Sequence, residues 1–176
     1  MEHSLRLLVR QPLTGYDLAA RMRHPIGYFW TARHSQIYPE LQRLASDGLV
    51  VSEVIDGPGP RPTRRYRITA SGRTALRAWV TSPIDLEPSR SEFLLRVYCL
   101  WLVDPAAGSR LVNDYRAKHA ARLSEYEGEH ANCLPEPASG TPGFASYATL
   151  RAGISYERHV VGYCDWLLEE LSAPSD

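Results

Sequence analysis

The chain has 176 residues, of which 44% are hydrophobic and 23% are charged, which predicts one or two small domains with a hydrophobic core. No apolar run approaches the ~20 residues that cross a bilayer, and the first residues carry no signal-peptide pattern. Cys99, Cys133 and Cys164 are far apart and lack metal-ligand spacing. We therefore expect a cytoplasmic protein with reduced thiols, no membrane association, no metal and no cofactor.

The net charge is zero, but the charges are unevenly distributed along the chain. Residues 1–80 hold twelve arginines against six acidic residues, a net charge of +6. Residues 81–176 hold eight basic against fourteen acidic residues, a net charge of −6. A basic half is a reason to consider nucleic acid as its partner, with two ordinary surfaces as the alternative.

The first 80 residues read as three helices, two strands and a fourth helix. In chain order the predicted elements are helices 2–10, 15–24 and about 35–47, strands 49–55 and 63–69, and helix 70–82. Thr14 and Thr69 are typical N-caps, and the segment 56–62 between the strands is a turn rich in glycine and proline. This order predicts an N-terminal winged helix-turn-helix domain over residues 1–82.

The third predicted helix has two different faces. Ile37, Leu41 and Leu44 form one apolar stripe, whereas the opposite side is polar. Proline is tolerated in the first turn of a helix, so Pro39 predicts a start near Ser35 or Gln36. Gly48 suits the left-handed position that ends a helix.

Helix three and the turn between the strands carry side chains suited to DNA. In a winged helix-turn-helix the third helix enters the major groove with its N-terminal residues first. Hydroxyl groups donate to phosphate, amides can bind adenine bidentately, and a guanidinium suits guanine. The residues expected to contact DNA in this way are His34, Ser35, Gln36, Tyr38, Gln42 and Arg43 of the helix and Arg61, Arg64 and Arg65 of the wing.

A linker over 83–90 leads to a predicted helical domain over 91–176. Its expected helices are 91–102, which is apolar nearly all round and should be buried on several sides, about 105–131, and 144–172. The last helix has two apolar stripes, so it should pack against its own domain and against another subunit, a single deep core being the alternative. The residues expected at the dimer interface are Tyr147, Leu150, Ile154, Val161, Leu168 and Leu171. Glu157 lies on the same stripe and is expected to pair with Arg158, to pair with Arg151 of a partner, or to face a cavity.

Specific motifs resemble one protein family. The run Gln36-Ile37-Tyr38-Pro39-x-Leu41-x-x-Leu44-x-x-x-Gly48-Leu49-Val50, together with Gly15-Tyr16 and Tyr66-x-Ile68-Thr69-x-x-Gly72, is similar to the PadR family of transcriptional regulators. The resemblance covers residues 5–80, and the second half matches only in its helical style. It implies a mostly α protein with a small β-hairpin and a C-terminal antiparallel helical dimerisation domain. It further implies a homodimeric repressor that binds a palindromic double-stranded DNA operator, with contacts near Gln36 and Tyr38 and with Tyr16 supporting the second helix against the DNA backbone.

The sequence also bears on an effector site and on three rival functions, of which a metal sensor is disfavoured because the ligand spacing is absent. Some family members respond to small aromatic molecules, and the aromatic residues Tyr98, Trp101 and Tyr115 are candidates for such a site, although aromatics at helical spacing more often form core or interface. An enzyme is disfavoured because no catalytic motif is present. A winged-helix protein-interaction module without DNA binding is the remaining alternative, but it would not need basic residues concentrated at the wing and the helix start.

Overall fold

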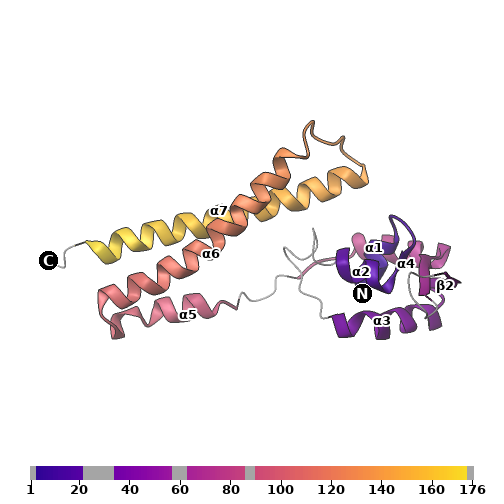
Figure 1. The fold of residues 1–176 in the computed structure, drawn as a ribbon, viewed down its shortest axis with the longest axis horizontal. Coiled ribbons are helices and arrows are strands. Elements are labelled where there is room, and N and C mark those ends of the chain that lie inside the picture. Colours follow the sequence, from indigo (N-terminus) through magenta and orange to yellow (C-terminus); the bar gives the residue numbers. More distant parts are fainter. Residues whose placement is uncertain (1–2, 22–33, 57–62, 86–89, 174–176) are drawn as a thin grey trace. The chain divides into compact units, whose positions relative to one another are not determined.

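The computed structural model describes residues 3–21, 34–56, 63–85 and 90–173, and it divides the chain into two compact units (Figure 1). The first unit comprises residues 1–85 and the second comprises residues 86–176. The boundary lies within the linker expected at 83–90. No helix in these described ranges is both long and apolar enough to cross a membrane.

The described part of the N-terminal unit combines four α-helices with a small sheet. Its elements are α1 (His3–Leu8), β1 (Leu13–Thr14), α2 (Gly15–Arg21), α3 (His34–Ser46), β2 (Val50–Ile55), β3 (Thr63–Ile68) and α4 (Ala70–Val80). The three antiparallel strands have the order β1-β3-β2. The hairpin of β2 and β3 was predicted, but the two-residue strand β1 was missed because it is too short for any alternation to show. These elements form a winged helix-turn-helix.

One hydrophobic core holds this unit together. It contains leucines of the first three helices and Tyr66 and Ile68 of β3, while Arg65 and Arg67 of the same strand lie on its solvent side. This is the alternation expected of a half-buried strand. The burial of Ile37, Leu41 and Leu44, each at most 2% exposed, fixes one side of α3 to the unit.

The C-terminal end of α3 is closed by Gly48. Its φ of 68° is left-handed, the Gly48 N–H donates to the Ala45 carbonyl at 3.1 Å, and the Leu49 N–H donates to the Leu44 carbonyl at 2.9 Å. This pair of bonds is a Schellman motif, which satisfies carbonyls that have no helical partner. The predicted end of the helix at Gly48 is confirmed.

Thr69 and Gly72 connect the wing to α4 and to the end of α3. The Thr69 hydroxyl accepts a bond from the Gly72 N–H at 3.0 Å and lies 2.8 Å from the Gly48 carbonyl, to which it donates. A Cβ on Gly72 would lie 2.2 Å from the Leu49 carbonyl oxygen. The spacing Thr69-x-x-Gly72 therefore reflects a helix cap placed where only glycine fits against the backbone.

The C-terminal unit consists of helices, with α6 and α7 lying side by side (Figure 1). Its elements are α5 (Glu92–Tyr98), the short 3₁₀ helix η2 (Leu100–Leu102), α6 (Pro105–Ala131) and α7 (Pro142–Ser172). Ser91, Asp104 and Thr141 cap α5, α6 and α7 with side-chain oxygens. A second core between these helices contains Phe93, Val112, Cys164 and Leu167.

The prediction of one helix over 91–102, buried on several sides, is wrong. The α-helix ends at Tyr98, and only Phe93 of α5 is fully buried. A single helix pair can cover only one side of α5, so the apolar residues on its other sides stay exposed within one chain. These exposed residues of α5 and η2 are Leu94, Leu95, Tyr98, Trp101 and Leu102.

Candidate nucleic-acid interface

The outer face of α3 is polar and exposed. Gln36, Gln42 and Arg43 are exposed, and the Tyr38 side chain is 48% exposed. Gln36 and Gln42 have no hydrogen-bond partner among the described residues, so both amides are available to a ligand. The face predicted to read DNA is thus presented by a helix whose other face is held in the core.

The start of α3 differs from the prediction. The helix already includes His34 and Ser35, and Pro39 lies inside it rather than in its first turn. The usual bond from residue 39 to the carbonyl of residue 35 is absent, because proline has no N–H. The side chains of His34 and Ser35 lie outside the described part of the structure, so their predicted contacts remain predictions.

Tyr38 rests on the first residue of α2. A Cβ built on Gly15 would lie 2.6 Å from Cε1 of the Tyr38 ring, a distance that real Cβ atoms do not show. The adjacent Tyr16 is 73% exposed. The motif Gly15-Tyr16 therefore combines a residue without a side chain, over which α3 can approach, with a tyrosine that extends into solvent.

The start of α2 is fixed by a reciprocal cap. The Thr14 hydroxyl accepts a bond from the Asp17 N–H at 3.1 Å, and the Asp17 carboxylate accepts from the Thr14 N–H at 3.1 Å and from the Thr14 hydroxyl at 2.7 Å. These bonds, that of the Thr14 side chain first, lower the pKa of Asp17. Thr14 was predicted as the cap. Asp17 three residues later completes a capping-box arrangement that we did not identify from the sequence.

The arginines of the wing differ in their surroundings. Arg64 and Arg67 are exposed and have no partner among the described residues. Arg65 lies opposite Glu53 of β2 and forms an exposed ion pair with it. Arg61 lies outside the described residues, so its predicted role is untested. Arg67 was recognised on the strand but not proposed as a contact, although it is exposed, as Arg64 and Arg65 are.

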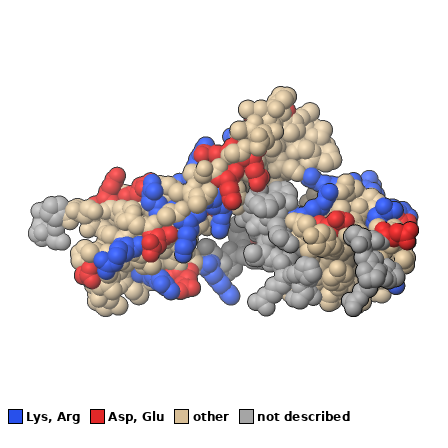
Figure 2. Space-filling view, in the orientation of Figure 1, with Lys and Arg blue, Asp and Glu red and all other residues tan. Residues whose placement is uncertain are grey.

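Basic and acidic side chains are interspersed along the helices of the C-terminal unit on the face shown in Figure 2. Several form ion pairs within the unit, among them Arg158 with Glu127 at 2.6 Å.

The sequence left the surroundings of Glu157 open, and the structure buries its side chain among residues of the same chain. Glu157 is 2% exposed, and its two carboxylate oxygens face Nδ1 of His119 and Nη1 of Arg122, the latter at 3.3 Å. Within one chain it does not pair with Arg158, which binds Glu127, or with Arg151, which donates to the Tyr147 hydroxyl at 3.1 Å. Pairing with Arg151 of a partner stays a prediction.

Half of the predicted dimer-interface residues are covered by the chain itself. Tyr147, Leu150 and Ile154 are at most 6% exposed within the single chain. These three side chains belong to the packing of α7 in its own unit and offer no surface to a partner, which corrects their assignment. The other three, Val161, Leu168 and Leu171, are only partly buried.

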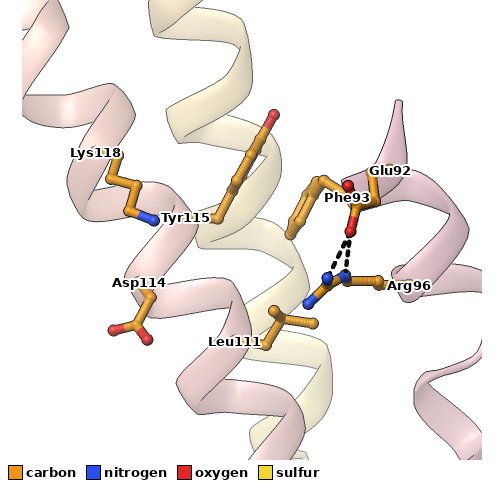
Figure 3. A pocket seen from close by; sticks show the side chains of 7 residues that line it. All are labelled: Glu92, Phe93, Arg96, Leu111, Asp114, Tyr115 and Lys118. Carbon is orange, nitrogen blue, oxygen red and sulfur yellow. Dashed lines mark hydrogen bonds and ion pairs between the residues drawn. The ribbon is translucent and has the colours of Figure 1, made fainter. Parts of the chain in front are cut away.

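One pocket of about 360 Å³ lies between α5 and α6 (Figure 3). The rings of Phe93 and Tyr115 stack beside it with centroids 3.8 Å apart. Burial raises the pKa of Tyr115 above its ordinary value. The lining residues are Glu92, Phe93, Arg96, Leu111, Asp114, Tyr115 and Lys118. Of the three predicted ligand residues the pocket therefore contains only Tyr115, while Tyr98 and Trp101 are about 80% exposed elsewhere.

Comparison with known proteins agrees with this architecture. A family model described as "Transcriptional regulator PadR-like family" matches residues 5–78, and one described as "Virulence activator alpha C-term" matches residues 89–172. Among curated relatives, the negative transcriptional regulator PadR of Bacillus subtilis is 31% identical over 169 residues, which cover 93% of this chain and 92% of that protein.

Solved structures resemble the whole chain as well. The crystal structure of Bacillus subtilis PadR in complex with operator DNA is 28% identical, with a TM-score of 0.88 and 96% of each chain covered. The same protein in complex with p-coumaric acid matches with a TM-score of 0.82 over 96% of each chain. The likeness thus extends over both units in sequence and in fold, and the chain belongs to the PadR-like family of DNA-binding transcriptional regulators.

Proposed function

We propose that this protein is a repressor that binds a palindromic operator as a homodimer, with α3 of each subunit in the major groove. The observation that carries this proposal is the exposed face of α3, where Gln36 and Gln42 have no partner among the described residues while Ile37, Leu41 and Leu44 are buried. The relative from Bacillus subtilis is a negative regulator and has been solved with operator DNA.

The chemistry of this face suits base edges. A glutamine amide can donate to and accept from adenine in the major groove, and an arginine can donate twice to guanine. Gln36 near the start of α3 and Gln42 one and a half turns later are therefore the side chains that read sequence. Arg43 and Tyr38 act beside them as base or phosphate contacts.

The wing supplies contacts that do not depend on sequence. Arg64 and Arg67 extend from β3 into solvent, and arginines in this position bind phosphate oxygens. The other proposed phosphate contacts are Arg65 of β3, Tyr16 on α2, His34 and Ser35 at the start of α3, and Arg61, which precedes β3 in the sequence. Two subunits related by a two-fold axis then bind half-sites ~10 bp or a multiple of that apart.

The dimer interface is proposed to include the apolar residues that one chain leaves exposed. Leu95, Tyr98 and Trp101 are each at least 70% exposed, which is costly for a cluster of this size in water. Val161, Leu168 and Leu171 of α7 are only partly buried and stay candidates as well. Covering these side chains with a second copy removes apolar area from water and stabilises the pair.

A small aromatic effector that relieves repression is a second element of the proposal. The relative solved with p-coumaric acid supports it, and the pocket beside Phe93 and Tyr115 offers aromatic rings and the ammonium of Lys118. The protein regulates by binding rather than by catalysis, and it acts in the cytoplasm where its DNA lies. Titration calorimetry with p-coumaric acid, using Tyr115→Ala as the comparison, tests the effector site.

The DNA-binding proposal is tested with the DNA upstream of the protein's own gene. We expect footprinting to reveal a protected palindrome and fluorescence anisotropy to yield a specific affinity. Gln36→Ala should relax preference at one base position by ~1–3 kcal/mol, while Gln11→Ala, an exposed glutamine outside α3, should leave it unchanged. A protein that binds all duplexes equally would contradict sequence-specific repression.

A further inference from the structure

Glu53 and Arg65 form the only wing ion pair found among the described residues. The two residues lie directly opposite each other in the antiparallel pairing of β2 and β3. Both Nε and Nη2 of Arg65 donate to the same Glu53 oxygen, Oε1, at 2.8 and 2.6 Å. The side chains are 46% and 62% exposed, so DNA phosphates can reach the pair from solvent.

The neighbouring arginines have no such acidic residue opposite them. Arg67 shares the outer face of β3 with Arg65 and lies opposite Val51, and Arg64 lies opposite Val54. Neither arginine has a partner in the described part of the chain. The carboxylate of Glu53 therefore binds one specific arginine among the three arginines of β3.

We infer that Glu53 occupies the place of a DNA phosphate on Arg65 and so weakens binding to every DNA sequence alike. This inference rests on the proposed function. A guanidinium binds a carboxylate and a phosphate through the same charge-assisted donors, so Arg65 must exchange one for the other when the wing meets DNA. Phosphate contacts carry no sequence information, so Glu53 lowers non-specific affinity and leaves discrimination to α3.

The size of the effect follows from the strength of an exposed pair. Removing the carboxylate frees Arg65 from an exposed ion pair, and exposed ion pairs are weak. Their usual strength corresponds to about a two- to fivefold increase in affinity for DNA. Because Arg65 binds a phosphate in the wild-type complex as well, the number of phosphate contacts is unchanged, and the slope of log K against log salt should stay close to that of wild type. The change in affinity should be equal for operator and for unrelated DNA.

The experiment is a double-mutant cycle read by fluorescence anisotropy. Wild type, Glu53→Gln, Arg65→Ala and the double variant are titrated with operator and with scrambled duplex at several salt concentrations. We expect Glu53→Gln to bind both duplexes about two- to fivefold more tightly, with a salt slope close to that of wild type. In the Arg65→Ala background the same change should have no effect. Glu127→Gln, which removes an exposed pair with Arg158 in the C-terminal unit, is the matched control and should bind as wild type.

The possible results separate this inference from the proposed function. If Glu53→Gln tightens binding equally in the Arg65→Ala background, the carboxylate acts by general repulsion and the inference is wrong. A second contradicting result is that Glu53→Gln and Glu53→Thr both bind DNA no more tightly than wild type. If both variants also melt at the wild-type temperature, a folding defect is ruled out and the inference is wrong. If the wild-type protein binds neither duplex, the proposed function is wrong, and this inference is wrong with it.

Discussion

The ring of Tyr38 in α3 lies against the backbone of Gly15 in α2, so closely that a Cβ on Gly15 would be 2.6 Å from Cε1 of the ring. The first residue of α2 thus sets the position of a tyrosine on the face that we propose to contact DNA. Gly15 and Tyr38 both belong to the motifs that resemble the PadR family. Their contact gives a physical reason for a glycine at position 15, since a side chain there would clash with the Tyr38 ring.

Gly15→Ala should destabilise the N-terminal unit and weaken operator binding. The added methyl group forces the Tyr38 ring to move, and because this ring is 48% exposed the cost should be at the lower end of overpacking, about 1 kcal/mol. Urea denaturation measures the change in the free energy of unfolding, and anisotropy measures the change in DNA affinity.

A second substitution and a control sharpen that test. Tyr38→Ala in the Gly15→Ala background removes the clash and should restore much of the lost stability. Gly162→Ala lies in the interior of α7 with nothing within 4 Å of the added Cβ, and it should stabilise the protein by ~0.5–1 kcal/mol. Equal effects of both alanine substitutions would rule out the Tyr38 contact as the cause.

The cap of α2 should make stability depend on pH in the acid range. The bonds from Thr14 lower the pKa of Asp17 in the folded protein below its unfolded value of about 3.9. The unfolded state therefore binds the proton more tightly, so the stabilisation is complete above the unfolded pKa and is lost as pH falls through the folded pKa.

Asp17→Asn should remove this part of the acid sensitivity. We expect its unfolding free energy to fall less than that of wild type between about pH 5 and pH 2, when both are followed by urea denaturation. Asp114→Asn changes an exposed aspartate for which no partner exists in the described ranges, and it should retain the wild-type slope. Parallel slopes for wild type and Asp17→Asn would contradict a role for this carboxylate.

The sequence predicted the N-terminal unit better than the C-terminal one. The apolar stripe of α3 and the left-handed Gly48 depend on neighbours close in the chain, so their pattern is visible in the residues themselves. The partners of Glu157 and the exposure of Leu95 depend on how helices far apart in the chain pack. The apolar stripes of α7 could not reveal which stripe faces α6, so Tyr147, Leu150 and Ile154 were assigned to the wrong surface.

Glu157 should be important for the stability of the C-terminal unit. Its buried carboxylate accepts from Arg122 and contacts His119, so Glu157→Gln leaves these groups without their anionic partner. We expect a loss of about 1–3 kcal/mol in the free energy of unfolding by urea. Glu127→Gln, whose carboxylate pairs with Arg158 at the surface, should cost less than ~1 kcal/mol. Similar losses for the two variants would show that burial of the Glu157 pair does not matter.

The exposed apolar surface of α5 should be required for dimerisation. Leu95 is 70% exposed in the single chain, so Leu95→Glu is tolerated by the fold but places a carboxylate within the proposed interface. Burying an unpaired charge there is costly, and we expect a shift from dimer to monomer in sedimentation velocity together with weaker operator binding, since each monomer holds only one half-site. Leu134→Glu is the matched control, because Leu134 is 61% exposed in the loop between α6 and α7. If Leu95→Glu sediments as the same dimer as Leu134→Glu, the interface lies on another face, and Val161, Leu168 and Leu171 become the next positions to substitute.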